Sequence, residues 1–268
     1  MKMLILIIPV SIRLSGALLA GISIALAMVP NAAPIPWVLD QEHTFNWISE
    51  RQKDGVTKFR LTDLAASKEN NPMPSARYRL TSEWQFTAPG SSRKKELEVF
   101  LAADWSVLRF RSSEHFSGID NKRANPVIEG AKEGDKLVLR SSEFKGKASE
   151  GKPTYEMDLP RDALIMPPQA IELWAVFLGQ LGTARLEEKN KQFPIAYPEF
   201  GKTFLVQFQL EDDKPLEFPG QDPIPCKHYS FKSQDKQLQG ELWLDKESRL
   251  IRYQQGKRTV QLEIPTKK

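Results

Sequence analysis

The chain has 268 residues, with 38 lysines and arginines against 34 aspartates and glutamates, which gives a formal net charge of +4 at pH 7. With 40% hydrophobic residues, 27% charged residues and 19 prolines, the composition excludes a collagen, a disordered tail, a disulfide scaffold and a polytopic membrane protein. The length suffices for one large domain or two small ones with a hydrophobic core.

Residues 1–33 predict a targeting segment rather than a part of the fold. Lys2 and Arg13 are their only charged residues, and an uncharged run, 14–29, leads into small residues and prolines. This order is typical of a cleaved secretory signal peptide. The alternative is an uncleaved N-terminal membrane anchor, since residues 4–12 add further apolar length. We therefore expect an exported, periplasmic protein or, alternatively, one anchored in the inner membrane through residues 14–29.

Cys226 is the only cysteine, so an internal disulfide and an acylated N-terminal cysteine are both excluded. Without Lys2 and Arg13, 36 basic residues face 34 acidic ones, a net charge of +2. Basic and acidic residues are interleaved, as in residues 94–98, so no basic stripe is present and no nucleic acid partner is expected.

From Phe45 onward the dominant sequence period is two, which predicts strands with one face in a core. The alternation is clearest in residues 78–86, 97–101, 204–210 and 260–264. Short turn signals at 53–55, 133–135, 233–236, 245–248 and 255–257 predict hairpins. The end of the chain therefore predicts an antiparallel meander of strands at 226–232, 238–244, 249–254 and 258–264.

Residues 163–182 are the exception, because Pro167 and Pro168 could open a helix that Gly182 closes. This helix, about 169–181, is apolar on nearly every side, so it is expected to be buried. The predicted fold is mainly β: a curved antiparallel sheet or half-open β-barrel, with the one apolar helix packed in or across it.

Polar segments at 65–75, 112–134 and 184–201 are rich in Pro, Asn, Gly and Lys and predict surface loops. None of them is long enough to separate folded domains. A single β-rich domain from 40 to 266 is therefore expected.

The sequence contains no glycine-rich dinucleotide or phosphate loop, no Cys-x-x-Cys and no His-Glu-x-x-His. Cys226 and His228 could share a strand face and hold a soft metal, but two ligands do not make a site. Glu114 and His115 are adjacent, so on a strand they point to opposite faces and cannot readily act as an acid and base pair. We therefore predict no catalytic residue, no metal and no cofactor.

Large aromatic residues on the predicted strand faces and on the helix either fill the core or line a cavity. In the second case, the curved sheet and the helix enclose space for an acyl chain, a polyprenyl chain or a sterol-like molecule. The residues predicted to bind such a ligand are Tyr78, Trp84, Trp105, Trp174 and Phe177.

The C-terminal meander resembles the closing strands of exported bacterial β-rich proteins from domain-of-unknown-function families. The residues that carry the resemblance are Leu242-Trp243-Leu244-Asp245, Leu250-Ile251-Arg252-Tyr253 and Gln255-Gly256-Lys257-Arg258-Thr259, with Asp54-Gly55 and Ser113-Glu114 in the N-terminal half. The resemblance implies an exported half-barrel broadly like the periplasmic lipoprotein carriers, with no assigned activity. This chain departs from the membrane-anchored members of that architecture because it lacks their amino-terminal cysteine.

Three function classes follow. The first is a non-enzymatic cell-envelope protein that binds a lipid or another hydrophobic or amphipathic ligand between sheet and helix. The second is an envelope assembly or interaction protein with a solid core and an envelope protein as its partner. The third is a hydrolase or isomerase acting on envelope glycans or lipids, which a cleft with two converging carboxylates of shifted acidity would favour.

Overall fold

The computed structural model describes residues 36–49, 52–67, 71–88, 90–118, 126–141, 155–167, 170–189, 191–219 and 221–264. The targeting segment predicted at 1–33 lies outside the described residues. Among the described residues, no helix is both long and apolar enough to span a membrane.

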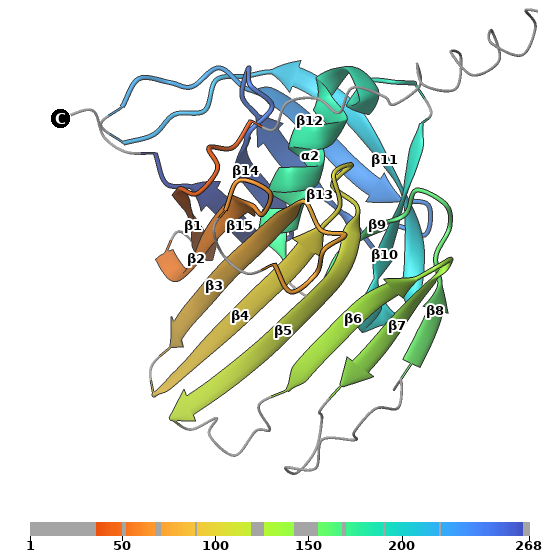
Figure 1. The fold of residues 1–268 in the computed structure, drawn as a ribbon. Coiled ribbons are helices and arrows are strands. Elements are labelled where there is room, and N and C mark those ends of the chain that lie inside the picture. The colour runs from red at the N-terminus through yellow and green to blue at the C-terminus, as the bar shows by residue number, and fades with distance from the viewer. Residues whose placement is uncertain are drawn as a thin grey trace, which may run out of the picture. The chain divides into compact units, whose positions relative to one another are not determined.

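In the part of the chain that the structure describes, fifteen strands form one continuous curved sheet (Figure 1). In chain order they are β1 (Glu42–Ser49), β2 (Gln52–Asp63), β3 (Tyr78–Ala88), β4 (Ser91–Leu101), β5 (Val107–Gly118), β6 (Val127–Glu133), β7 (Lys136–Ser141), β8 (Tyr155–Asp158), β9 (Leu164–Ile165), β10 (Gln192–Tyr197), β11 (Lys202–Asp213), β12 (Lys227–Ser233), β13 (Gln239–Leu244), β14 (Leu250–Gln255) and β15 (Arg258–Leu262). A helix, α2 (Ile171–Leu186), precedes β10, and a 3-10 turn, η2 (Pro198–Phe200), follows it.

The sheet is two meanders joined through the pairing of β1 with β15. Strands β1 to β8 follow one another on one side of this junction, and β15 back to β9 follow on the other. All neighbours are antiparallel except β9 and β10. The predicted C-terminal meander of four strands is confirmed, with ends within two residues of those expected.

The two edge strands, β8 and β9, are consecutive in the chain and do not pair with each other. Residues 159–163 connect them, so the chain itself crosses the seam of the unclosed sheet. The hydroxyl of Tyr155 in β8 also donates a hydrogen bond to the carbonyl oxygen of Gly201, at 3.0 Å. The sheet is therefore a half-open barrel whose edges are tied together at these points.

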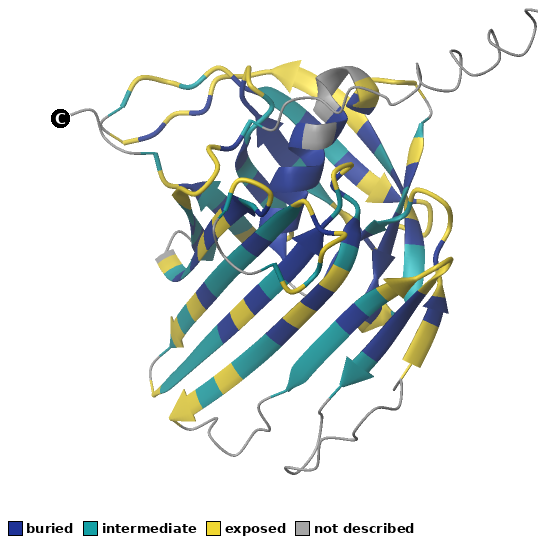
Figure 2. Ribbon diagram, viewed as in Figure 1, coloured by how far each residue is buried: buried dark blue, intermediate teal, exposed yellow. Residues whose placement is uncertain are grey.

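Buried residues alternate with more exposed ones along several strands, among them β4, β11 and β12, as the bands of colour in Figure 2 show. On β4, for example, Leu97 and Val99 are buried, whereas Glu96 is exposed. The concave face is the core predicted from the period of two.

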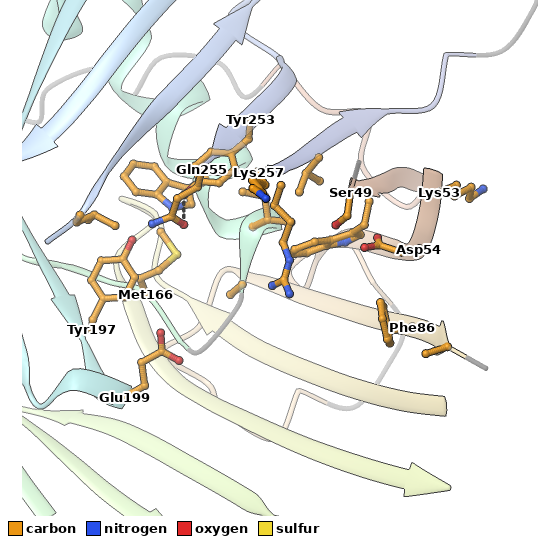
Figure 3. Close-up of a pocket in the computed structure, with 18 of the residues that line it drawn as sticks. Ser49, Lys53, Asp54, Phe86, Met166, Tyr197, Glu199, Tyr253, Gln255 and Lys257 are labelled. Atoms are coloured by element: carbon orange, nitrogen blue, oxygen red, sulfur yellow. Dashed lines mark hydrogen bonds between the residues drawn. The ribbon is translucent and has the colours of Figure 1, made fainter. Parts of the chain in front are cut away.

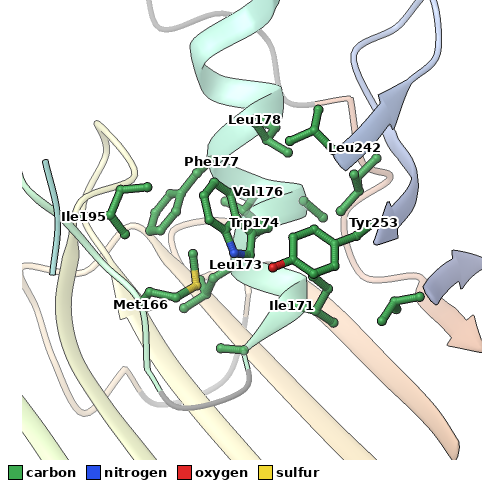
Figure 4. Close-up of a cluster of buried hydrophobic side chains, with 14 of the residues drawn as sticks. Met166, Ile171, Leu173, Trp174, Val176, Phe177, Leu178, Ile195, Leu242 and Tyr253 are labelled. Atoms are coloured by element: carbon green, nitrogen blue, oxygen red, sulfur yellow. The ribbon is translucent and has the colours of Figure 1, made fainter. Parts of the chain in front are cut away.

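Helix α2 lies within the curve of the sheet, with residues 171–179 all buried. Trp174 packs against rings from three strands, Phe208, Phe231 and Tyr253, with centroid distances of 5.3–6.3 Å. Figure 4 shows the ring of Tyr253 beside that of Trp174. The indole N–H of Trp37 donates to the carbonyl oxygen of Ala175 at 3.1 Å. The predicted architecture, a curved antiparallel sheet with one apolar helix packed in it, is confirmed for the described residues.

Two details of the expected elements are wrong. The helix does not end at Gly182 but continues to Leu186, which is 1% exposed. Burial of the Leu186 side chain outweighs the roughly 1 kcal/mol that a glycine costs in a helix interior. Asp54 and Gly55 lie inside β2 rather than in its turn. A side chain at Gly55 would place its Cβ 2.8 Å from the carbonyl oxygen of Gln85, so close strand approach explains the glycine.

The loops expected at 112–134 and 184–201 are also wrong in large part. The first contains the end of β5 and all of β6, and the second contains the end of α2, all of β10 and η2. The first segment looks like a loop in sequence because its inward side chains include polar ones, among them Ser112 and Glu114.

Candidate functional site

A cavity of about 870 Å³ opens below the N-terminal end of α2, between the ends of several hairpins (Figure 3). Its walls come from β1 to β3, the β14–β15 hairpin, the start of α2 and the η2 turn. Because β1 pairs with β15, the two meanders meet here, and residues far apart in sequence face the same space. The volume is within the range of small-molecule binding pockets, about 300–1,000 Å³.

Aromatic rings make up much of the cavity lining; these rings, the aromatic wall, are those of Trp47, Phe86, Trp174, Tyr197 and Tyr253. The indole N–H of Trp47 donates to the hydroxyl of Thr57 at 2.7 Å, which fixes its ring in the wall. The hydroxyl of Tyr253 donates to the side-chain oxygen of Gln255 at 3.0 Å. Rings held in this way offer a preformed apolar surface.

Both tyrosines of this wall stay neutral. Burial raises the pKa of Tyr197, and it raises the pKa of Tyr253 well above its ordinary value. The aromatic wall therefore presents phenols and indoles and no anion.

A rim of polar and charged side chains belongs to the same lining and adjoins the aromatic wall, since Gln255 accepts a hydrogen bond from Tyr253. It carries both signs, from Ser49, Lys53, Asp54, Glu199, Gln255, Lys257 and Arg258. A cavity with an apolar wall and a charged rim suits a molecule that is itself amphipathic.

A buried charged group lies close to this cavity. Lys95, on the concave face of β4, is 3% exposed, and its Nζ has no hydrogen-bond partner among the described residues. Burial lowers the pKa of Lys95, and the carboxylates of Glu172, Glu114 and Glu199 oppose that shift. An isolated buried ammonium group is costly, so this residue calls for an explanation.

Glu172, in the first turn of α2, is also 3% exposed, and the hydroxyl of Ser82 donates a hydrogen bond to its Oε1. Burial raises the pKa of Glu172, against the effects of Ser82 and Lys95. Burial likewise raises the pKa of Glu199, which lines the cavity.

Glu114 faces the same interior, but both of its carboxylate oxygens already accept hydrogen bonds. Arg93 donates to both of its carboxylate oxygens at 2.7 Å. The guanidinium of Arg93 also lies over the rings of Trp84 and Phe116, at 5.1 and 5.3 Å from their centroids. His115, the neighbour of Glu114, is exposed on the other face, so the expectation that the two cannot share a site is confirmed.

The two carboxylates with raised pKa values differ in access. Glu199 reaches the cavity, whereas Glu172 is buried and does not line it. Hydrolysis of glycosides uses a pair of carboxylates that both reach the substrate. Of the two carboxylates with raised pKa values, the cavity lining includes only Glu199; the other carboxylate in the lining is Asp54 of β2.

The five residues predicted to bind a ligand lie at different places. Trp174 lines the cavity. Trp84 does not line the cavity itself. Its ring is stacked on that of Phe86, with centroids 5.9 Å apart, and lies edge-on to that of Trp47, with centroids 5.8 Å apart. Phe177 is 1% exposed in the hydrophobic core.

Tyr78 and Trp105 are stacked on each other at 3.7 Å near the turn between β4 and β5, and neither lines the cavity. Trp105 adopts a left-handed backbone conformation, with φ of 67°, before β5 begins. Trp105 therefore belongs to a turn rather than to the expected strand, whereas Tyr78 is the first residue of β3.

Sequence reasoning missed Tyr197, Tyr253, the charged rim, Lys95 and Glu172. The tyrosines stand on strands whose alternation is visible in the sequence, but nothing there shows that β10 and β14 face each other across α2. Lys95 stands in a run of charged residues, 93–96, where a single inward lysine gives no separate signal.

The local pair considered for a metal does not form a site. Cys226 is buried, which raises its pKa to about 11. His228 instead lies flat on Trp243, with ring centroids 4.5 Å apart, and contacts Asp212 at 3.0 Å and Glu241 at 3.3 Å. No cluster of three or more metal-ligating side chains is found within the described residues.

A second hollow, of about 880 Å³, lies over β1 to β5 and is lined mainly by charged side chains such as Arg60 and Arg111. Some of its charged groups pair with each other, as Lys58 does with Glu42 at 3.0 Å. This surface is typical of a solvated sheet face, so the aromatic cavity is the better candidate site.

No protein-family model matches the chain, and no curated protein matches it in sequence. Among solved structures, it is similar to a β-barrel-like protein of the domain of unknown function DUF1849 from Brucella abortus. That likeness has 10% identity and a TM-score of 0.49, and it covers 83% of this chain and 94% of the other. A DUF1089 family protein from Pseudomonas aeruginosa is similar at 11% identity and a TM-score of 0.38, covering 70% of this chain and 94% of the other.

Both families are of unknown function, as are those that the C-terminal meander resembles. With TM-scores below 0.5, neither likeness carries an argument about activity. The function must therefore be argued from the cavity itself.

Proposed function

We propose that this chain is an exported cell-envelope protein that binds an amphipathic ligand in the cavity below α2. The observation that carries the proposal is the composition of that cavity: aromatic rings and charged groups of both signs line one space of about 870 Å³. Export is supported by the order of charged, apolar and small residues in 1–33.

The apolar part of the ligand packs against the rings of Trp47, Phe86, Trp174 and Tyr253. Burial of its methylene groups supplies the binding free energy, about 0.8 kcal/mol for each group removed from water. Its polar part remains in contact with charged groups, because an unpaired polar group in the aromatic wall would be costly.

Binding can be measured through the tryptophans. Trp47 and Trp174 line the cavity, so a bound dansyl-labelled undecanoic acid should accept energy from them and quench their emission. We expect saturable quenching by the wild-type protein. The Ala88→Trp variant fills the cavity from the end of β3 and should weaken the affinity by at least about tenfold, or about 1.4 kcal/mol.

Ala66→Trp is the matched control, because Ala66 is exposed in the turn after β2 and does not line the cavity. It should bind the probe like the wild-type protein. Absence of saturable quenching in the wild-type protein, or equal weakening by the two tryptophans, would contradict the proposal.

A further inference from the structure

Lys95, whose buried Nζ has no hydrogen-bond partner among the described residues, has no role in the binding proposal above. By strand register it stands between Trp84 of β3 and Glu114 of β5, on the concave face. Trp84 stacks on Phe86, and Glu199 interacts electrostatically with Lys95; both Phe86 and Glu199 line the cavity. Lys95 therefore does not line the cavity itself, but a strand neighbour, Trp84, and an interacting carboxylate, Glu199, connect it to the cavity lining.

The acidic groups around Lys95 do not supply it with a close partner. Glu114 accepts two hydrogen bonds from Arg93. Glu172 accepts one from Ser82, and burial favours its neutral form. Glu199, the third, lies at the cavity rather than against the lysine's Nζ, which has no hydrogen-bond partner within the described part of the chain.

The ammonium group of Lys95 is left without a direct ionic partner. Arg93 and Glu114 pair with each other at 2.7 Å, and burial favours the neutral forms of Glu172 and Glu199. When Lys95 is protonated, its Nζ therefore has no hydrogen-bonded carboxylate among the described residues. A ligand oxygen that approached from the cavity would find three N–H donors there, and charge-assisted bonds are the stronger kind.

We propose that Lys95 is the internal anchor for the acidic head group, a carboxylate or a phosphate, of an amphiphile whose chain lies along the aromatic wall. This inference rests on the proposed function and adds the chemical class of the ligand and its orientation. The head group enters past Glu199 and ends beside Lys95, while the chain points toward the hairpin ends.

The test compares ligands that share one chain and differ in the head group: hexadecanoate, hexadecyl phosphate and hexadecanol. Each displaces the dansyl probe from the wild-type protein, from Lys95→Met and from Lys94→Met. Lys94 is the matched control because it is the next residue on β4, is 41% exposed and pairs with Glu83 and Glu96 on the outer face.

We expect the wild-type protein to bind at least one acid about tenfold or more tighter than the alcohol, as a charge-assisted hydrogen bond implies. The preferred acid distinguishes a carboxylate head group from a phosphate. Lys95→Met should lose this preference with little change in its affinity for hexadecanol. Lys94→Met should keep it, and Lys95→Arg should restore most of it.

Equal affinity of the wild-type protein for the acids and the alcohol would overturn the inference. This result needs no variant, so the inference can be tested even if the Lys95→Met protein does not fold. Parallel weakening of all three ligands by Lys95→Met would also overturn it, since that is what a purely structural lysine predicts. In both cases the proposed function stands, because the ligands still bind. Failure of every ligand to displace the probe would instead contradict the proposed function.

Discussion

Glu172 illustrates how one residue links the stability of the core to pH. Its carboxyl is 3% exposed in the first turn of α2, and its hydrogen bond from Ser82 ties the helix to β3. The positive end of the helix dipole favours its ionised form, but burial disfavours it more strongly, so its pKa is raised.

The raised pKa predicts how Glu172→Gln changes the free energy of unfolding with pH. A carboxyl whose pKa is higher in the folded state stabilises the fold fully at low pH, and this stabilisation is lost as the pH rises through the folded-state pKa. Relative to Glu172→Gln, the wild-type protein should therefore lose stability as the pH rises above about 4.3, the ordinary value for glutamate. Urea unfolding of both proteins at several pH values measures the difference.

Glu83→Gln provides the control of opposite sign. Its carboxyl is partly exposed, and a hydrogen bond from Lys94 lowers its pKa. Here the wild-type protein should lose relative stability as the pH falls, and only slightly, since the pair is screened by solvent. A pH-independent difference between wild type and Glu172→Gln would contradict the account of Glu172.

Helix α2 is stabilised by what surrounds it rather than by its own sequence. It is apolar on nearly all sides and contains two glycines, Gly179 and Gly182, so packing inside the sheet must hold it. Residues 36 and 37 cover one side: Trp37 bonds to Ala175, and the ring of Pro36 lies against Gly179.

Gly179→Ala tests this packing. A Cβ there would lie 2.6 Å from Cδ and 2.7 Å from Cγ of Pro36, so the proline must move. Alanine gains about 1 kcal/mol of helix propensity, but we expect net destabilisation because overpacking typically costs 1–3 kcal/mol. In a Pro36→Ala background the change should destabilise less, by about 0.5 kcal/mol or more, in urea unfolding. An equal effect in both backgrounds would show that Pro36 is not the obstacle.

The strands could be predicted from the sequence where the local pattern of apolar and polar residues matches their burial in the structure. The alternation of residues 78–86 predicts β3, and the turn signals of the last forty residues predict β12 to β15. The prediction failed for residues 112–118 because Ser112 and Glu114 point inward, and a period of two that is polar on both faces resembles a loop.

The candidate site was less predictable than the fold. Trp174 could be chosen because it stands on an apolar helix, and Trp84 because it stands on an alternating strand. Tyr78 and Trp105 satisfy the same criteria, yet they stack on each other at a turn away from the cavity. Which aromatic residues meet is decided by the pairing of β1 with β15, a contact between opposite ends of the described chain that no local pattern specifies.

At the scale of the whole described unit, the open sheet explains why a cavity exists. The helix fills the upper part of the curve, and the hairpin ends below it are not filled by any second element among the described residues (Figures 1 and 3). The chain connects the edge strands through residues 159–163, so the curve is held without complete closure. A core filled at one end and hollow at the other agrees with a binding protein better than with a solid interaction domain.

The central claim is that this hollow holds one amphipathic molecule. Native mass spectrometry of the protein, purified under mild conditions from the cells that naturally make it, tests the claim most directly. The account predicts one extra mass per chain that disappears on denaturation, matches an acidic amphiphile in the organic extract and is absent from Ala88→Trp. A clean mass of the unliganded wild-type protein, or an extra mass retained by Ala88→Trp as fully as by Ala66→Trp, would contradict it.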